Sequence, residues 1–249
     1  PDSGKISILG GAMNEAKKNQ IGYLPEERGL YQDIPLERCM TYLATLKGMS
    51  ETQIQQELPI WLEKFDLSAY RKKKIKDLSK GMQQKAQLIA ALIHNPEIII
   101  VDEPFSALDP LNTQLVKDLF LEQRNAGKTI IMSTHQMNQV EMLCDHLVLI
   151  DHGINLLQGG LQEVKERFAT HDVLLKTREL LPEKLAGVAE IQHGNNHSYL
   201  LKPQPGITPQ ELLAELVRSA IPIESFEIAV PSLDEIFIQV VQDGQHDSK

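Results

Sequence analysis

The sequence has little cysteine. Cys39 and Cys144 are the only two among 249 residues, and both lie in apolar surroundings. Two cysteines cannot build a disulfide framework, so this usage fits a reducing compartment such as the cytosol. The sequence also lacks an apolar run of the roughly 20 residues that a membrane-spanning helix needs, and it lacks a signal-peptide pattern. If the protein works at a membrane, we expect a partner to supply the spanning helices.

Basic residues are also fewer than acidic ones. The chain has 25 Lys and Arg against 34 Asp and Glu, a formal net charge of −9. This balance argues against a protein that reads nucleic-acid phosphates with its whole surface. One basic run, at residues 71–74, is interpreted as a solvated loop rather than a lipid or phosphate contact. The composition, 42% hydrophobic and 24% charged, is that of an ordinary globular protein.

Strands and helices alternate in the first two thirds of the chain. Short strands are predicted at 5–9 and 21–24, a fully apolar strand at 98–101 and another strand at 129–133. A compact helical block, about residues 33–95, lies between the second and third of these strands. The alternation predicts an α/β fold with a mostly parallel sheet and this helical block as an inserted subdomain.

The pattern changes after residue 168. Short strand-like segments around a Gly194-Asn195-Asn196 turn predict a small antiparallel sheet, and two capping boxes, at 208–211 and 232–235, predict helices. We therefore predict a first domain at 1–169 and a small α+β domain at 170–249.

Two acids follow the apolar strand. Asp102 and Glu103 come directly after Ile98 to Val101. Open α/β sheets bind ligands outside the carboxyl ends of their strands. An acid there can hold Mg²⁺ through water, and a second acid can orient or deprotonate an attacking water. Taken alone, the pair is equally compatible with a solvated loop.

A second candidate site lies 24 residues before Glu103, at Ser79-Lys80-Gly81. A helix that begins at Ser79 offers free backbone N–H groups and a hydroxyl, which together suit an anion. An isolated match of this kind is more often a plain helix cap. Its spacing from the acid pair, filled by one helix and one strand, favours a phosphate and metal site.

Four motifs in this order resemble the ATP-binding cassette (ABC) ATPases of membrane transporters. They are an LSGGQ-like signature, an acidic strand end, a SALD loop and a histidine after the next strand. In this sequence they read Leu78-Ser79-Lys80-Gly81-Met82, Val101-Asp102-Glu103-Pro104, Ser106-Ala107-Leu108-Asp109 and Ser133-Thr134-His135. The resemblance implies a P-loop NTPase-like fold that binds ATP and Mg²⁺ and hydrolyses ATP.

The resemblance also implies a role for each matching residue. Asp102 coordinates Mg²⁺ through water, Glu103 is the general base, and His135 contacts the γ-phosphate. Asp109 links two nucleotide sites in a head-to-tail dimer, formed with a second copy or a paralogous ATPase subunit. The signature residues grip the ATP of the opposite subunit: Ser79, Lys80, Gly81, Met82 and Gln83.

Some positions depart from the family pattern. Glu26 stands where the family's Q-loop has glutamine; it can still ligate Mg²⁺ and touch the membrane partner, but it adds negative charge beside ATP. Lys80 and Met82 depart from LSGGQ, although Ser79 and the backbone N–H groups of the helix start remain.

The sequence also has no G-x-x-x-x-G-K-[ST] phosphate loop. In the family this loop precedes a turn like the one from Pro1 to Lys5. We therefore expect a fragment, truncated at its N-terminus just after the phosphate-loop helix, that cannot hydrolyse ATP alone.

The residues around 231–237 resemble the accessory domain of ABC-2-type and sodium-extrusion-like export ATPases. This resemblance implies the ATPase subunit of an exporter, at the cytoplasmic face of the cell membrane and paired with transmembrane permease subunits. One rival is the chromosome or DNA-repair class of ABC ATPases, which inserts long coiled coils where this chain has 53 positions between Glu26 and Ser79. The other rival is a non-catalytic regulatory module. We expect no nucleic-acid partner.

Overall fold

The computed structural model describes residues 2–27, 29–106 and 108–246. Pro1 of the predicted entry turn and Ala107 of the predicted SALD loop lie outside the described residues. The chain forms two compact units, residues 1–136 and 137–249. No helix within the described ranges is long and apolar enough to cross a bilayer.

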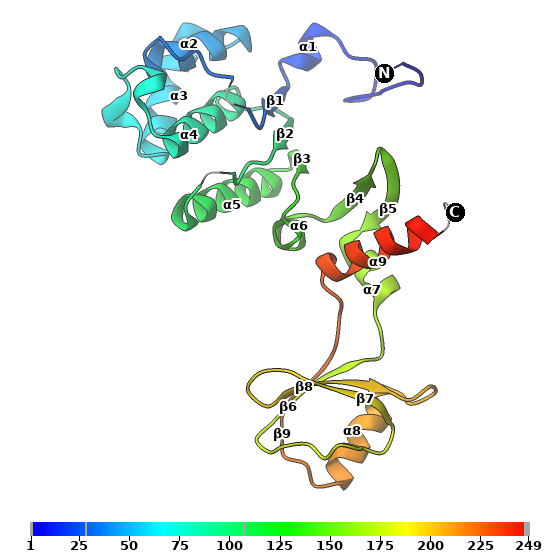
Figure 1. Ribbon diagram of the computed structural model, residues 1–249. Coiled ribbons are helices and arrows are strands. Elements are labelled where there is room, and N and C mark those ends of the chain that lie inside the picture. Colours follow the sequence, from blue (N-terminus) through cyan, green and yellow to red (C-terminus); the bar gives the residue numbers. More distant parts are fainter. Residues whose placement is uncertain (1, 28, 107, 247–249) are drawn as a thin grey trace. The chain divides into compact units, whose positions relative to one another are not determined.

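The first unit contains a three-stranded parallel sheet in the order β1-β2-β3, which Figure 1 shows in blue to green. The register aligns Leu24 with Val101 and Asp102 with Ser133. The predicted parallel α/β fold is therefore confirmed. The elements of this unit are α1 (Glu15–Lys18), β1 (Ile21–Leu24), α2 (Leu36–Leu46), α3 (Glu51–Lys64), 3₁₀ turns at Ser68–Tyr70 and Ile75–Asp77, α4 (Lys80–Leu92), β2 (Ile98–Asp102), α5 (Pro110–Asn125) and β3 (Thr129–Ser133).

One face of this sheet packs on helices. Leu24, Ile99 and Val101 are almost completely buried, and α4 packs against β1 while α5 packs against β3. The helical block of α2 and α3 begins after β1, and a capping box of Ser50 and Gln53 starts α3. The sequence thus places an inserted helical segment between two neighbouring strands of one sheet.

The strand predicted at 5–9 is not formed. Its backbone makes only an isolated bridge between Ile8 and Gly11, and the side chains of Ile6 and Leu9 are 60% and 40% exposed. A strand needs a partner with which to pair its backbone groups, and the described residues provide none for this segment.

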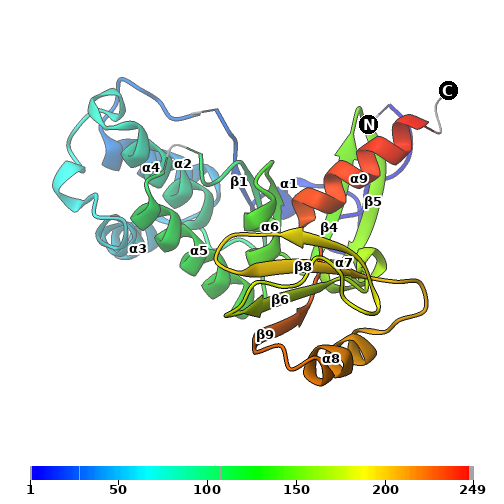
Figure 2. The same ribbon diagram turned by 60° about the horizontal axis from the view of Figure 1, so that its bottom comes forward.

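The second unit has a hairpin and a separate four-stranded antiparallel sheet. Its sheet has the order β7-β8-β6-β9, with α8 packed on it, as Figures 1 and 2 show. The elements are α6 (Met137–Leu143), β4 (His146–Asp151), β5 (Ile154–Gly160), α7 (Leu161–Phe168), β6 (Val173–Thr177), β7 (Val188–His193), β8 (Ser198–Pro203), α8 (Pro209–Arg218), β9 (Ile223–Ile228) and α9 (Leu233–His246).

The last helix of the second unit returns to its first elements. Leu233 and Ile236 of α9 form one buried cluster with Leu157 of β5 and Val164 of α7. Because α9 packs with elements that precede residue 169, the compact units divide at 136 and 137. The domain boundary predicted from the change of pattern, near residue 169, remains a prediction.

Candidate functional site

The predicted acids and histidine lie at one edge of the parallel sheet. Parallel strands end at the same edge, so the residues that follow β1, β2 and β3 share it. Asp102 is the last residue of β2, and Glu103 follows it. His135 lies two residues beyond β3, and Glu26 two residues beyond β1, where it is exposed. The strand order thus places all four at this edge.

Glu103 is held firmly by the turn that follows β3. Its carboxylate accepts hydrogen bonds from the backbone N–H of His135 (2.8 Å) and the Thr134 hydroxyl (3.3 Å). The imidazole Nδ1 of His135 lies 2.7 Å from the same carboxylate. The backbone N–H of Glu103 donates to the Ser133 carbonyl, and its φ of 44° is left-handed. A non-glycine residue with this φ is uncommon, and the contacts with the β3 turn hold it there.

The two side chains of this pair differ in exposure. The Glu103 side chain is 15% exposed, whereas the His135 side chain is 81% exposed. Since a carboxylate only accepts, Nδ1 of His135 is the donor, and Nε2 remains for another contact. The pair therefore presents an open histidine whose ring is oriented by a half-buried acid.

Asp102 supplies a single carboxylate for a metal ion. Its Oδ1 accepts a hydrogen bond from the Ser133 hydroxyl at 2.5 Å. Among the described residues, no group of three or more His, Cys, Asp or Glu side chains is placed to hold a metal ion. Mg²⁺ in nucleotide sites takes one or two carboxylates and completes its shell with phosphate oxygens and water. The donor set of this edge fits that kind of site and does not fit an all-protein metal cage.

The signature segment forms an open helix start. Ser79 is the N-cap of α4, and its hydroxyl accepts from the backbone N–H of Met82 at 3.3 Å. Ser79 and Lys80 are exposed, and Gly81 and Met82 are half-buried. The predicted helix start is thus confirmed, and its first N–H groups lie at the surface of the unit.

The Gln83 side chain does not lie with this open end. Its amide donates to the carbonyls of Ile75 (3.1 Å) and Leu78 (3.0 Å), and the residue is only 8% exposed. In this structure the side chain holds the loop before α4, so a contact with nucleotide would need its backbone or a rearrangement.

Asp109 caps α5. Its carboxylate accepts from the backbone N–H of Asn112 at 2.9 Å and from the Asn112 side-chain amide. The backbone hydrogen bond from Asn112 is the main reason that the pKa of Asp109 is lowered. The carboxylate therefore stays charged at the start of this helix, where an anion is favourable.

Two glutamines were missed by sequence reasoning. Gln84 and Gln87 of α4 are each 4% exposed, and they donate to the carbonyls of Pro104 (3.5 Å) and Glu27 (3.1 Å). They join the signature helix to the acid loop and to the Glu26 loop. A signal was present, since two amides at i and i+3 interrupt the apolar face of a helix.

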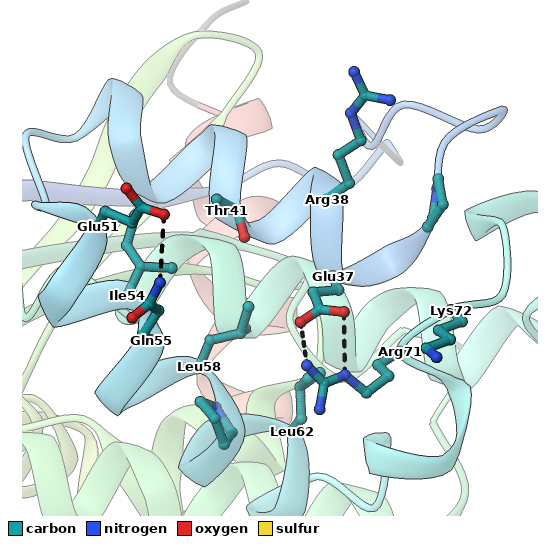
Figure 3. A pocket seen from close by; sticks show the side chains of 12 residues that line it. Glu37, Arg38, Thr41, Glu51, Ile54, Gln55, Leu58, Leu62, Arg71 and Lys72 are labelled. Carbon is teal, nitrogen blue, oxygen red and sulfur yellow. Dashed lines mark hydrogen bonds and ion pairs between the residues drawn. The ribbon is translucent and has the colours of Figure 1, made fainter.

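A pocket of about 480 Å³ lies elsewhere, in the helical block between α2 and α3. In Figure 3, Glu37 and Arg71 form a paired contact at its centre, and Leu58 and Leu62 line its apolar wall. Its lining includes none of the predicted site residues. The candidate chemistry therefore belongs to the sheet edge and not to this pocket.

Comparisons with known proteins agree with these motifs. Residues 1–106 match the ABC transporter family, and residues 159–241 match the C-terminal domain of DrrA1-3-like ATP-binding proteins. The chain is 40% identical over 240 residues to the uncharacterized ABC transporter ATP-binding protein YhaQ of Bacillus subtilis, covering 96% of this chain and 80% of YhaQ.

Two further similarities bear on transport. The Nod factor export ATP-binding protein I of Rhizobium sp. strain N33 is 34% identical over 163 residues, covering 64% of this chain and 54% of that protein. A solved ATP-binding subunit of an ABC transporter superposes with a TM-score of 0.58 at 32% identity, covering 62% of this chain and 64% of that one.

A relative from Alkalihalophilus pseudofirmus, the uncharacterized ABC transporter ATP-binding protein BpOF4_11395, matches almost from end to end. It is 38% identical over 243 residues, which cover 97% of this chain and 90% of the relative. With the acid edge and the signature helix in the order of that family, the chain belongs to the ABC transporter ATP-binding proteins.

Proposed function

We propose that this chain is the ATP-hydrolysing subunit of an ABC-type exporter that works at the cytoplasmic face of a membrane with transmembrane permease subunits. The observation that carries the proposal is the Glu103–His135 contact of 2.7 Å at the carboxyl edge of the sheet, next to Asp102. The similarity to an export ATP-binding protein supports the direction of transport.

The chemistry assigned to the edge is the attack of water on the γ-phosphate of ATP. Glu103 takes the proton of the attacking water as the new oxygen–phosphorus bond forms and the bond to ADP breaks. His135 is oriented by Glu103 through Nδ1, and in the imidazolium form its Nε2–H also donates, here to a phosphate oxygen. Asp102, with Glu26 at the neighbouring strand end, would hold Mg²⁺, which would neutralise phosphate charge.

The signature helix is assigned to a second subunit's ATP. The N–H groups at the start of α4 and the Ser79 hydroxyl form an anion site that faces outward from its own unit. In the proposed head-to-tail dimer, residues 79–83 approach the nucleotide of the partner, and Asp109 lies between the two sites. Closure of the dimer on ATP and its opening after hydrolysis then drive the permease subunits.

We infer in addition that residues 1–249 do not turn over ATP by themselves. The sequence has no G-x-x-x-x-G-K-[ST], so the described edge provides the acids and the histidine without the backbone cradle that holds β- and γ-phosphates. The test is to measure Mg-ATP hydrolysis by the chain as given and by the chain behind a segment that carries this motif. Hydrolysis at equal rates would contradict this inference.

The same hydrolysis assay tests whether Glu103 acts as the general base. In the chain that carries the phosphate loop, we expect Glu103→Gln to lower kcat by about 10² to 10⁴-fold, because the amide cannot accept the proton. Glu97→Gln is the matched control, since Glu97 is exposed just before the amino end of the same strand. A Glu103→Gln variant as active as the Glu97→Gln variant would remove Glu103 from the role of general base.

A further inference from the structure

Three neighbouring glutamines of α4 bind loop backbones. Gln83, Gln84 and Gln87 are 8%, 4% and 4% exposed, and each side-chain amide donates to a carbonyl outside the helix. Positions 83 and 87 are one turn apart, and 84 and 87 share the same face. Through these side chains α4 contacts its own leading loop, the acid loop and the Glu26 loop.

The contact of Gln87 joins the signature helix to the Glu26 loop. Its Nε2 donates to the carbonyl of Glu27 at 3.1 Å, across 60 positions of sequence. Glu27 follows Glu26 directly, and Gln87 lies eight residues after Ser79, roughly 12 Å along the helix. A helix of 13 residues is stiff over that distance, so the loop and the signature end are connected through one rigid element.

The other end of this amide has no partner. Gln87 Oε1 is buried and makes no hydrogen bond within the part of the chain that the structure describes. Reversing the amide would turn Oε1 toward the Glu27 carbonyl, an acceptor facing an acceptor, so the observed orientation is the one that the contact requires. A buried acceptor left unpaired costs free energy, and a donor that reached it would recover that cost.

We propose that Gln87 is a positioning residue that ties the Glu26 loop to the signature helix. Its unpaired Oε1 accepts a backbone N–H of that loop when the loop shifts. This inference rests on the proposed function, in which Glu26 serves the chain's own nucleotide and Ser79 serves the partner's. Because of this hydrogen bond (the tether), the position of Glu26 depends on the position of Ser79. It therefore couples two nucleotide sites through a single side chain.

The first test needs no nucleotide. Hydrogen–deuterium exchange of the intact chain is measured by mass spectrometry for Gln87→Met, which keeps the length of the side chain and removes both polar atoms. We expect exchange in the peptide that carries Glu26 and Glu27 to rise about five-fold, which corresponds to the loss of one neutral hydrogen bond of roughly 1 kcal/mol. Unchanged exchange in that peptide would overturn the proposal.

Gln84→Met is the matched control, because Gln84 is equally buried on the same helix but contacts the carbonyl of Pro104. It should loosen the peptide of residues 103–106 and leave the Glu26 peptide unchanged. If Gln87→Met does not fold, Gln87→Asn retracts the amide by one methylene and is measured in its place. An equal rise in exchange throughout the chain would mean general destabilisation and would also contradict the tether.

The second test uses the assembled transporter with a phosphate loop supplied. We expect Gln87→Met to lower the Hill coefficient of ATP hydrolysis toward 1. A changed exchange pattern with an unchanged Hill coefficient would reduce Gln87 to a structural contact. If no ATP is hydrolysed even without the substitution, the proposed function fails, and the exchange experiment still decides whether the tether exists.

Discussion

At the scale of single residues, the site is defined by side chains that hydrogen bonds to backbone and side-chain groups of neighbouring segments hold in place. Glu103 is fixed by three donors from the turn after β3, and His135 is in turn oriented by Glu103. Gln83 is fixed inward by two carbonyls of the preceding loop. The residue identities were read from motifs, but which atoms remain free for a ligand follows from these contacts.

His94, at the opposite edge of the sheet, gives a prediction about pH. Burial lowers its pKa from 6.5 to about 4, its Nε2 lies 3.2 Å from the Ile21 carbonyl, and its buried Nδ1 has no partner among the described residues. Lys47 and Lys128 add positive charge nearby and also lower this pKa. Protonation is therefore easier in the unfolded chain than in the folded one.

It follows that the stability contributed by the neutral, buried His94 is fully present above pH 6.5 and is lost as the pH falls toward 4. We expect His94 to account for a loss of about 1 to 2 kcal/mol between pH 7 and pH 5. Urea unfolding at both pH values measures it, and His94→Gln, which does not titrate, should show a smaller difference. An equal pH dependence in the two proteins would mean that His94 is not the titrating group.

At the scale of elements, the candidate site depends on the packing of β1 against α4. Gly22 of β1 packs directly on the backbone of α4, and a Cβ at this position would lie 2.2 Å from the Ala91 carbonyl oxygen. No side chain can replace glycine there without moving the helix or the strand. The positions of the Glu26 loop and the signature helix thus both depend on the close contact of Gly22 with the backbone of α4.

We predict that Gly22→Ala destabilises the protein by about 3 kcal/mol, because the clash is with backbone atoms that cannot rotate away. Gly29→Ala is the control, since its Cβ would meet only the Pro25 ring at 4.0 Å, and it should change stability by less than about 0.5 kcal/mol. Thermal and urea unfolding compare the two. Equal midpoints for both variants would show that β1 and α4 do not pack this closely.

At the scale of the whole molecule, the last helix of the second unit packs against the first elements of that unit. In the second unit the chain leaves the hairpin and α7, builds the sheet of β6 to β9, and returns with α9 to the cluster of Leu157 and Val164. Leu233 and Ile236 therefore stabilise elements that come 69 to 79 positions earlier in the sequence.

We expect Ile236→Ala to destabilise this unit by about 2 to 4 kcal/mol, because Ile236 is 1% exposed in the cluster. Ile238 lies on the same helix and is 53% exposed, so Ile238→Ala should have little effect. The measurement is the unfolding midpoint with exchange followed in β5 and α7. If Ile236→Ala and Ile238→Ala have the same unfolding midpoint, α9 does not stabilise the hairpin.

The sequence alone determined the α/β class of the fold, and it gave the predicted residues of the candidate site. Alternating apolar segments predicted the parallel sheet, the capping boxes predicted the starts of α8 and α9, and four spaced motifs predicted the acid pair, the signature serine and the histidine. These signals are local, because each depends on residues within one turn or one strand.

Only the tertiary structure decided the contacts between segments far apart in the chain. It left the segment at 5–9 without a strand partner, turned Gln83 inward, joined Gln87 to Glu27 and packed α9 on α7. The partner in each of these contacts has no local signal, since a hydrogen bond across 60 positions or a helix that returns to a hairpin depends on which surfaces the folded chain brings together. The candidate site residues are recognised in the sequence, and the contacts that hold them are set by the fold.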